Sequence, residues 1–560
     1  MNFNLLIGGA AGQGMETLSH TLSKILQRRG YHLFTLQDYM SRVRGGHNFF
    51  QLRFSENDVK THRDDLDGII ALNQETLDLH IHRLNADGFI IADNDVKSDD
   101  KRLITLPAKD LAKEVGNPKV QSSVILGTLL KLYGMDNTHL EDILAAKFDT
   151  KVITQNVEAF QRGFDMVEAR YEEPELHKED NLLIQANDAI ALGALAGGLK
   201  FYSAYPMTPA TSIMSYLVQK SVPAKVVVEQ AEDEIAAINM AIGASYAGVR
   251  AMTGTSGGGY SLMVEALGMA GIAEIPLVIA EIQRPGPATG LPTRTEQSDL
   301  KFVINSSHGE FPRMVIALRN PEDAFYQTAR AFNLADKYQI PIILLGDQYM
   351  ADAVRTVKPF DLDKIENNYY MADEEEYRNG KEYKRFALTD NGISPRLIPG
   401  RVPGTMVNSD SDEHDEDGNI TEASDVRINM VEKRDKKFQL LKEEVMEPEL
   451  LGEEDMDILL LGWGSLHSPL SEAVDLLNEA SDQKFGCLVF GDIWPMPEKL
   501  LREKAKSAKV LINVEQNFTG QLAALISEVT GIRVDQSVLK YDGRPLSAVE
   551  IKNKVMEVLK

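Results

Sequence analysis

Apolar runs of strand length alternate with segments of helical spacing along most of this chain. An apolar run from residue 4, a glycine-rich turn and a helical segment at 15–28 come first, and further alternation follows to about residue 168. The same pattern recurs at 182–358 and at 457–560. Strands that alternate with helices are typical of α/β domains with parallel sheets. The sequence therefore predicts an α/β fold with three α/β domains.

Changes in composition place the predicted domain boundaries. An acidic stretch with one proline, residues 171–180, is a good linker after a first domain at 1–175. The second domain is predicted at 182–358. Residues 359–456 are acidic and poor in long apolar runs, which indicates an elaborated connection, and 457–560 form the last domain.

One segment of the connection resembles half of a calcium-binding loop. Its residues 413–418 are rich in acids, but Glu413 stands at the first ligand position and Ser424 at the twelfth, and both are poor matches. The prediction is a polar turn before the basic run at 433–437. No metal ligand is expected on this chain.

Charge and cysteine content exclude several classes of function. The 560 residues include 59 lysines and arginines against 84 aspartates and glutamates, a formal net charge of −25. Such a charge argues against nucleic acid and anionic membranes as partners. No apolar run is long enough to span a bilayer and no signal peptide is evident, so we expect a cytoplasmic protein. The lone Cys487 cannot form an internal disulfide or hold an iron–sulfur cluster by itself.

The glycine-rich turn at Gly9–Gly14 invites a nucleotide-binding interpretation. The dinucleotide pattern requires a third glycine where Thr17 stands, and no convincing ribose-binding acid follows the next strand. A tight turn without a ligand is the preferred interpretation, although an anion on the helix N-terminus stays open. Arg42 and Arg44 further on predict a solvated basic loop, with an anion-binding turn at an interface as the alternative.

Two strand ends in the second domain carry hydroxyl groups. In Tyr205–Pro209 two prolines fix the backbone on either side of Met207 and Thr208, at a strand end where open α/β sheets place their ligands. In 251–259 another strand ends in Thr255 and Ser256 followed by glycines, which let a ligand approach the backbone closely. Both loops are candidate binding elements.

An acidic residue between these loops occupies an unusual position. If a helix begins near Gln230, Glu234 lies on one arc with apolar and small residues, namely Ile235, Ile238, Ala241, Ile242 and Ser245. Glu232 and Asp233 then point elsewhere. A buried carboxyl must find a polar partner or stay protonated. An ordinary buried acid paired with a neighbour and a functional acid are both open from this pattern alone.

A long loop follows the next strand of the second domain. Residues 283–299 are rich in proline, glycine and threonine, and they include Arg284 and Arg294. Loops of this length inside a compact domain are usually functional. The sequence therefore predicts a functional loop that contains the two arginines.

Together these motifs resemble the fused gamma–alpha subunit of the 2-oxoacid:ferredoxin oxidoreductases, which are thiamine-diphosphate enzymes, and in particular the 2-oxoglutarate type. The turn at Gly9–Gly14 with Arg44-Gly-Gly46 resembles the gamma domain. Tyr205–Pro209 matches the family motif Tyr-Pro-Ile-Thr-Pro with one conservative change. Glu234 and the glycine-rich segment at 251–259 resemble the pyrimidine-binding domain. The C-terminal region resembles a transketolase C-terminal-like domain.

The resemblance implies thiamine diphosphate as the cofactor and assigns residues to it. In thiamine enzymes a glutamate hydrogen-bonds the aminopyrimidine ring, which implies that role for Glu234, with a semi-buried carboxyl that keeps its proton near neutrality. Thr208 is then expected beside the reacting carbon. Arg294 is expected at the substrate carboxylate, with Arg284 as the alternative. The implied cofactor-binding residues are Tyr205, Pro206, Thr208, Glu234, Thr255, Ser256 and Gly257.

The diphosphate half of such a site is missing from the sequence. No Gly-Asp-Gly motif occurs, and Gly346-Asp347-Gln and Gly491-Asp492-Ile are the nearest segments. The family carries the diphosphate site, magnesium and a [4Fe-4S] cluster on a beta subunit. The resemblance therefore implies that this chain supplies half an active site, in a heterodimer or a dimer of heterodimers.

The implied reaction is oxidative decarboxylation of a 2-oxoacid, with 2-oxoglutarate expected, to an acyl-coenzyme A. Coenzyme A is the implied co-substrate, and electrons pass through the beta subunit to ferredoxin. Two alternatives stay open. One is a non-oxidative thiamine-dependent decarboxylase or transketolase-like subunit, and the other is a nucleotide-sensing assembly subunit that uses the turn at Gly9–Gly14.

Overall fold

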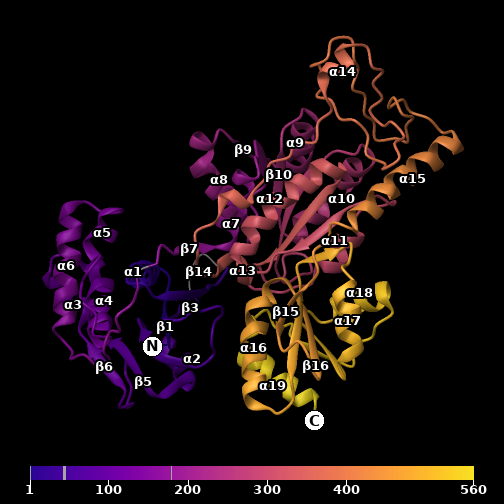
Figure 1. The fold of residues 1–560 in the computed structure, drawn as a ribbon. Helices are drawn as coiled ribbons and strands as arrows, with labels where there is room; N and C mark the ends of the chain where they lie inside the picture. Colours follow the sequence, from indigo (N-terminus) through magenta and orange to yellow (C-terminus); the bar gives the residue numbers. More distant parts are fainter. Residues whose placement is uncertain (1, 42–45, 178) are drawn as a thin grey trace. The chain divides into compact units, whose positions relative to one another are not determined.

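The computed structural model describes residues 2–41, 46–177 and 179–560, which form two compact units. The first unit spans Met1–Ile184 with Asp352–Pro359 and Ser547–Val549, and the second holds the rest of the chain. Figure 1 shows the elements of both units along the chain. Within the described residues no helix is both long and apolar enough to cross a membrane.

The first unit is built on an eight-stranded sheet of the described residues with the order β6-β5-β4-β1-β3-β2-β14-β7. Its strands are β1 (Asn2–Gly9), β2 (His32–Asp38), β3 (Asn48–Ser55), β4 (Leu66–Ala71), β5 (Leu84–Asp93), β6 (Leu103–Leu106), β7 (Leu182–Gln185) and β14 (Val354–Val357). Strands β1, β4, β5 and β6 run parallel, whereas β3, β2 and β14 follow one another antiparallel. Strands β14 and β7 lie inside the predicted range 182–358 but belong to the first sheet.

Helices of the first unit follow the expected strand–turn–helix order. They are α1 (Met15–Arg28), α2 (Gln74–His80), α3 (Ala108–Glu114), α4 (Gln121–Leu132), α5 (Leu140–Ala145) and α6 (Thr150–Phe164), with short 3-10 turns η1 (Ile81–Arg83) and η2 (Pro118–Val120). Helices α4 and α6 pack at close range. A Cβ added to Gly127 would stand 2.9 Å from the Phe160 carbonyl carbon, so only glycine permits this packing.

The second unit contains two sheets. A seven-stranded sheet has the order β18-β12-β13-β11-β10-β8-β9 and is parallel except for β18. Its strands are β8 (Phe201–Ala204), β9 (Val227–Gln230), β10 (Ala251–Thr255), β11 (Leu277–Gln283), β12 (Met314–Ala317), β13 (Pro341–Asp347) and β18 (Asp492–Trp494). The helices of this sheet are α7 (Ala186–Ala196), α8 (Thr211–Ala224), α9 (Glu234–Tyr246), α10 (Gly257–Ile272), α11 (Leu300–Asn305), α12 (Pro321–Tyr338) and α13 (Gln348–Asp352).

The last sheet has five strands in the order β15-β17-β16-β19-β20, parallel apart from β15. Its strands are β15 (Glu449–Gly452), β16 (Ile458–Trp463), β17 (Phe485–Phe490), β19 (Val510–Glu515) and β20 (Gln536–Leu539). The accompanying helices are η4 (Gly464–Leu466), α16 (His467–Ala480), α17 (Lys499–Ser507), α18 (Gln521–Thr530) and α19 (Ala548–Val558).

The two sheets of the second unit share one apolar core. Residues from α9 and α10, such as Ile242 and Leu267, belong to the same buried cluster as Trp463 and Leu488 from the last sheet. Strand β18, which follows β17 in sequence, pairs with β12 of the other sheet. The predicted α/β fold class is confirmed, and two of its predicted domains merge into one packed body.

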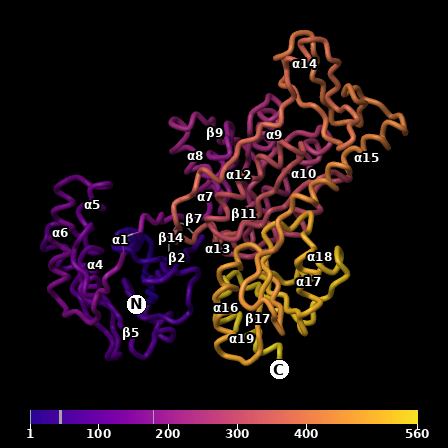
Figure 2. Tube along the Cα trace, viewed as in Figure 1, coloured from indigo at the N-terminus to yellow at the C-terminus, as the bar shows by residue number. Residues whose placement is uncertain are grey.

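The connection contains an unpredicted long helix. The connection includes η3 (Leu362–Lys364), α14 (Glu374–Arg378) and the long helix α15 (Ser424–Leu441). Both α14 and α15 are drawn in orange in Figure 2. The turn at 416–418 precedes α15, while the basic run predicted to follow a polar turn lies inside this helix. Glu413 does not face a cation site: its carboxylate is paired with Arg427 and with Arg434, the latter at 3.0 Å.

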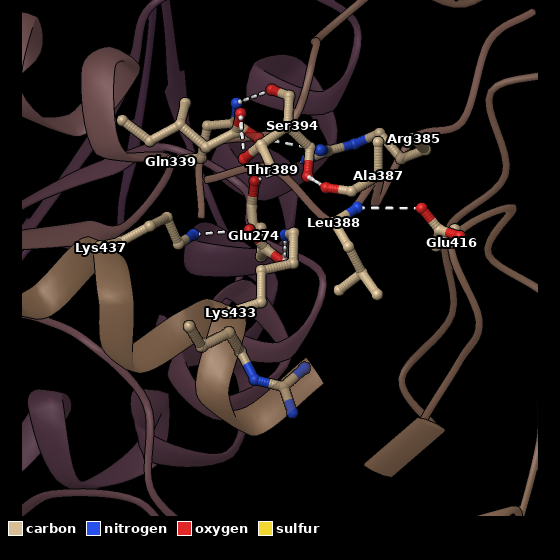
Figure 3. A network of polar contacts seen from close by, with 12 residues as sticks. Glu274, Gln339, Arg385, Ala387, Leu388, Thr389, Ser394, Glu416, Lys433 and Lys437 are labelled. Carbon is tan, nitrogen blue, oxygen red and sulfur yellow. Dashed lines mark hydrogen bonds and ion pairs between the residues drawn. The ribbon is translucent and has the colours of Figure 1, made fainter. Parts of the chain in front are cut away.

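Helix α15 is fastened by a buried ion cluster (Figure 3). Lys433 and Lys437 stand one turn apart and both donate to the carboxylate of Glu274, beyond the end of α10, with Lys437 Nζ at 2.6 Å. All three side chains are at most 1% exposed. Burial opposes ionisation of Glu274, but the lysines and Arg385 outweigh it and hold its pKa well below its usual range. Burial lowers the pKa of Lys433 to about 7.

Replacing Glu274 with glutamine is expected to destabilise the second unit by about 3–5 kcal/mol, because two buried ammonium groups lose their counter-charge. Urea denaturation followed by tryptophan fluorescence reports this unit specifically, since Trp463 and Trp494, the chain's two tryptophans, both belong to it. The matched control is Glu376→Gln, which breaks an exposed, solvent-screened pair with Lys381 and is expected to leave stability nearly unchanged. Equal losses in the two variants would contradict the assignment.

Candidate functional site

The loop after β8 is held by two side chains from other elements. Arg284 Nη1 donates to the carbonyl oxygen of Thr208 at 2.8 Å, and Asn187 Nδ2 donates to that of Pro209 at 2.9 Å. Tyr205 is 42% exposed, whereas Thr208 is half-buried. The structure therefore places the Thr208 segment at the carboxyl end of β8, on a backbone that is fixed from both sides.

Glu234 is the first residue of α9, not a residue of its second turn. Asp233 caps the helix by accepting from the Ala236 amide at 2.7 Å, and Gln230 still belongs to β9. The later start corrects the predicted helix near Gln230. Glu234 is 6% exposed, while Ile235, predicted on the same arc, is 50% exposed. From position 234 the helical repeat brings these residues onto the buried face: Ala237, Ile238, Ala241, Ile242 and Ser245.

The first turn of α10 meets the Glu234 side chain. A Cβ added to Gly259 would stand 2.5 Å from Glu234 Oε1, and it would also overlap Thr255 Oγ1. Thr255 Oγ1 in turn lies 3.5 Å from the sulfur of Met207 in the loop after β8. The structure thus brings the Thr208 segment, Glu234 and the end of β10 together.

Polar groups at this junction lack partners within the described part of the chain. The carboxylate of Glu234 makes no hydrogen bond there, and the buried Ser256 hydroxyl caps α10 with none. The amides of Gly257, Gly258 and Gly259 have no acceptor among the same residues. The Glu234 carboxyl can accept a hydrogen bond, or donate one when it is protonated, and the hydroxyl and amides beside it can donate. Such a set of groups suits a polar heterocycle.

The two arginines of the long loop lie in different surroundings. Arg284 contacts Thr208 directly, and burial lowers its pKa without removing its charge. Arg294 packs beside Gly543, where an added Cβ would stand 3.2 Å from Arg294 Cβ. Its main-chain amide donates to Leu291 at 3.1 Å. Contact with the Thr208 segment is therefore established for Arg284, the predicted alternative, and not for Arg294.

Two acids near the site, one buried and one partly buried, were missed from the sequence. Glu281 in β11 is fully buried, and the carboxyl group of Asp299 packs against Gly257 at the start of α10. A glutamate inside the apolar strand at 277–283 is a signal that sequence reasoning had available. Asp299, in contrast, stands among polar loop residues and carries no such signal.

The glycine-rich turn of the first unit closes on itself. Gly12 and Gly14 both have φ near 87°, a conformation that favours glycine, and Gln13 Oε1 accepts from the Ala10 amide at 2.7 Å. Beside it lies a cavity of about 330 Å³ lined by two acids, Glu16 and Asp38, among other residues. The predicted basic turn at Arg42 and Arg44 lies outside the described residues.

Comparisons with known proteins give this geometry a family. The pyruvate ferredoxin/flavodoxin oxidoreductase model matches residues 4–166, and the model described as pyruvate flavodoxin/ferredoxin oxidoreductase, thiamine diP-bdg, matches residues 192–433. A 2-oxoacid:ferredoxin oxidoreductase subunit alpha from Sulfolobus sp is 33% identical over 627 residues, with 100% of this chain and 97% of the relative covered. This chain belongs to the family of 2-oxoacid:ferredoxin oxidoreductase alpha subunits. The resemblance drawn from the motifs is confirmed.

Further relatives agree with this family. A 2-oxoglutarate synthase subunit KorA from Methanothermobacter thermautotrophicus is 30% identical, with 68% of this chain and 99% of the relative covered. A solved structure of 2-oxoglutarate:ferredoxin oxidoreductase from Magnetococcus marinus, with 2-oxoglutarate, coenzyme A and succinyl-CoA bound, is 30% identical. It superposes with a TM-score of 0.93 and full coverage of both chains.

The thiamine-binding model spans the whole junction described above. Residues 192–433 include Thr208, Glu234, Thr255 and both loop arginines. The unpaired carboxylate of Glu234 and the unpaired hydroxyl of Ser256 fit the pyrimidine end of thiamine diphosphate, which offers both donors and acceptors. The chain therefore carries a thiamine-diphosphate site whose individual residue roles stay predictions.

Replacing Gly259 with alanine is expected to weaken thiamine-diphosphate binding by about tenfold, because the new methyl group displaces the Glu234 carboxyl. The measurement is calorimetric titration of the cofactor into the assembled enzyme. Gly243→Ala is the matched control: Gly243 lies in α9, and a Cβ there meets nothing within 4 Å. Unchanged affinity in Gly259→Ala would contradict the close approach.

Proposed function

We propose that this chain is the pyrimidine-binding subunit of an enzyme that oxidatively decarboxylates a 2-oxoacid to an acyl-coenzyme A and passes electrons to ferredoxin. The observation that carries the proposal is the carboxyl of Glu234, which is unpaired among the described residues and lies beside the first turn of α10. The relatives named for 2-oxoglutarate, and the matching structure with 2-oxoglutarate bound, support that acid as substrate.

Residues of this chain have separable tasks in the proposed reaction. Thiamine diphosphate supplies, when bound, a nucleophilic carbon and an electron sink for decarboxylation. Glu234 holds or accepts a proton at a ring nitrogen, because its carboxyl makes no hydrogen bond to the described residues, lies beside the first turn of α10 and is shielded from solvent. Thr208 presents a hydroxyl to the substrate oxygens from a backbone fixed by Arg284 and Asn187.

A guanidinium suits the substrate carboxylate because its planar donors match two oxygens. Arg294 keeps this role in the proposal, and Arg284 is the alternative. Arg284 already donates one hydrogen bond to the Thr208 carbonyl, which suits a residue that positions the loop. Arg294 lies on the same long loop, which is anchored at its far end through Thr295 and Gln297.

The diphosphate half of the site is proposed to come from a beta subunit with magnesium and a [4Fe-4S] cluster. The two Gly-Asp segments of this chain are occupied elsewhere: Asp347 accepts from Ser465, and Asp492 accepts from Arg330 at 2.8 Å. No group of three or more metal-ligating side chains is found within the described ranges. Exposed apolar side chains near the site, including Tyr205, Ile235 and Leu262, support a covering partner.

Glu234→Gln is expected to leave the fold intact and to lower turnover by about 10²- to 10⁴-fold, because an amide holds the ring but cannot exchange a proton with it. Dye reduction by the assembled enzyme with 2-oxoglutarate and coenzyme A measures this. Glu232→Gln is the matched control, since Glu232 lies two positions earlier and is exposed. Normal turnover in Glu234→Gln would refute the role.

The same assay separates the alternatives. Carbon dioxide release without dye reduction, with and without coenzyme A, would favour a non-oxidative thiamine enzyme. Strong nucleotide binding together with indifference to Glu234→Gln would favour a nucleotide-sensing subunit. Reduction that depends on both 2-oxoglutarate and coenzyme A supports the proposed reaction.

Arg294→Lys is expected to raise KM for the 2-oxoacid by about tenfold or more with a smaller change in kcat, because lysine cannot make the paired contact. Arg284→Lys is expected to affect kcat more, since it loosens the Thr208 carbonyl. Steady-state kinetics on both variants provide the measurement. The reverse pattern would assign binding of the substrate carboxylate to Arg284 instead of Arg294.

A further inference from the structure

Glu281 is a buried acid with no donor to stabilise its charge. It lies in β11, between apolar neighbours, and it is 0% exposed. Among the described residues neither of its carboxyl oxygens accepts a hydrogen bond. A carboxylate in such surroundings is strongly disfavoured, so the side chain must carry a proton or share one.

The group that meets Glu281 is another acid, Asp299. Asp299 stands at the N-cap position of α11, yet its carboxyl makes no capping bond. Its amide donates to Gln283 Oε1 at 2.9 Å, two residues beyond Glu281 on the same strand, and after burial its carboxyl is the main cause of the raised pKa of Glu281. Two carboxyl groups can form a hydrogen bond only when one of them carries a proton.

The surroundings oppose full ionisation of this pair. Burial and the neighbouring acids Asp299 and Asp347 raise the pKa of Glu281 well above its usual range. Burial raises the pKa of Asp299 to about 6. The titratable groups that face the pair are Asp347 from β13, Tyr260 from α10 and Glu296 from the preceding loop. These are acids and a phenol, so none of the three favours a negative charge.

The pair touches the same helical turn as the Glu234 side chain. Asp299 packs against Gly257, where an added Cβ would stand 3.0 Å from Asp299 Cγ. Two residues later, Gly259 makes room for Glu234. A second full charge on the pair would therefore add repulsion beside a third carboxyl and push on the turn that borders the cofactor site.

We propose that Glu281 and Asp299 share one proton at neutral pH and that this pair is a positioning element, which holds the first turn of α10 against Glu234. Its consequence for catalysis rests on the proposed function. The shared proton is a property of this chain alone and is measurable without cofactor or partner.

The first test is the pH dependence of unfolding of the full chain. Because both acids bind protons more tightly in the folded state, their contribution to stability is complete at low pH; the part from Asp299 is lost as pH rises through about 6, and the part from Glu281 is lost only at higher pH. The melting temperature of the wild type is therefore expected to fall from about pH 5 to about pH 8. In Glu281→Gln a permanent amide donor faces Asp299, so this fall is expected to be smaller.

The control for this test is Glu265→Gln, an exposed position on α10 that should keep the wild-type pH dependence. A wild-type pH dependence in Glu281→Gln would overturn the proposal. Infrared spectroscopy covers the case in which that variant fails to fold. The wild-type chain at about pH 7 is expected to show the carbonyl band of a protonated carboxyl, and absence of any such band would also overturn the proposal.

The positioning role needs the assembled enzyme. Glu281→Ala is expected to weaken thiamine-diphosphate binding about tenfold, whereas Glu281→Gln is expected to restore it, because only the amide can bond to Asp299. Equal affinity in wild type and Glu281→Ala would refute positioning. If the wild-type enzyme binds no thiamine diphosphate, the proposed function fails. The measurements on the chain alone still show whether Glu281 and Asp299 share a proton.

Discussion

The approach of Glu234 to the first turn of α10 is the constraint on which the candidate site depends. Gly259 leaves room for a carboxyl that any side chain at that position would displace. Three separate segments must therefore meet at one point: the start of α9, the end of β10 and the loop after β8. Each is brought there by the parallel strand order β10-β8-β9, which aligns the carboxyl ends of neighbouring strands at one edge of the sheet.

Buried acids in the second unit are stabilised in two different ways. Glu274 is ionised because two lysines of α15 supply opposite charge at hydrogen-bonding distance. Glu281 has an acid as its neighbour, which leaves protonation as the way to avoid an unpaired charge. The contacts of Glu274 with the two lysines attach the connection to the rest of the second unit beyond the end of α10, whereas the site borders the first turn of this helix. The second arrangement lies at the site, where a proton that can be lost links the position of the first turn of α10 to pH.

Local sequence pattern predicted most of the fold and much of the site, because strands and loops at their ends depend on short-range spacing. The Thr208 loop follows β8 and the hydroxyls of Thr255 and Ser256 stand at the end of β10, as the pattern indicated, and Glu234 is buried although its helix begins later than the pattern placed it. Helix α15 was missed because three of its five buried residues, Lys433, Arg434 and Lys437, are basic, so its buried face shows no apolar periodicity. Strand β14 and Asp299 were missed because their partners, β2 and Glu281, are distant in sequence.

The last sheet contributes no proposed site residue, yet it fixes the loop that does. The Gln297 amide donates to the Gln516 carbonyl at 2.7 Å, and its side chain donates to the Trp463 carbonyl at 3.0 Å. Gln521 likewise donates to the carbonyl of Ser298 at 2.6 Å. The C-terminal region therefore holds Gln297 and Ser298, which lie between Arg294 and Asp299. A shared core between the two sheets is therefore a condition for the site, since a loop of this length would otherwise sample many conformations.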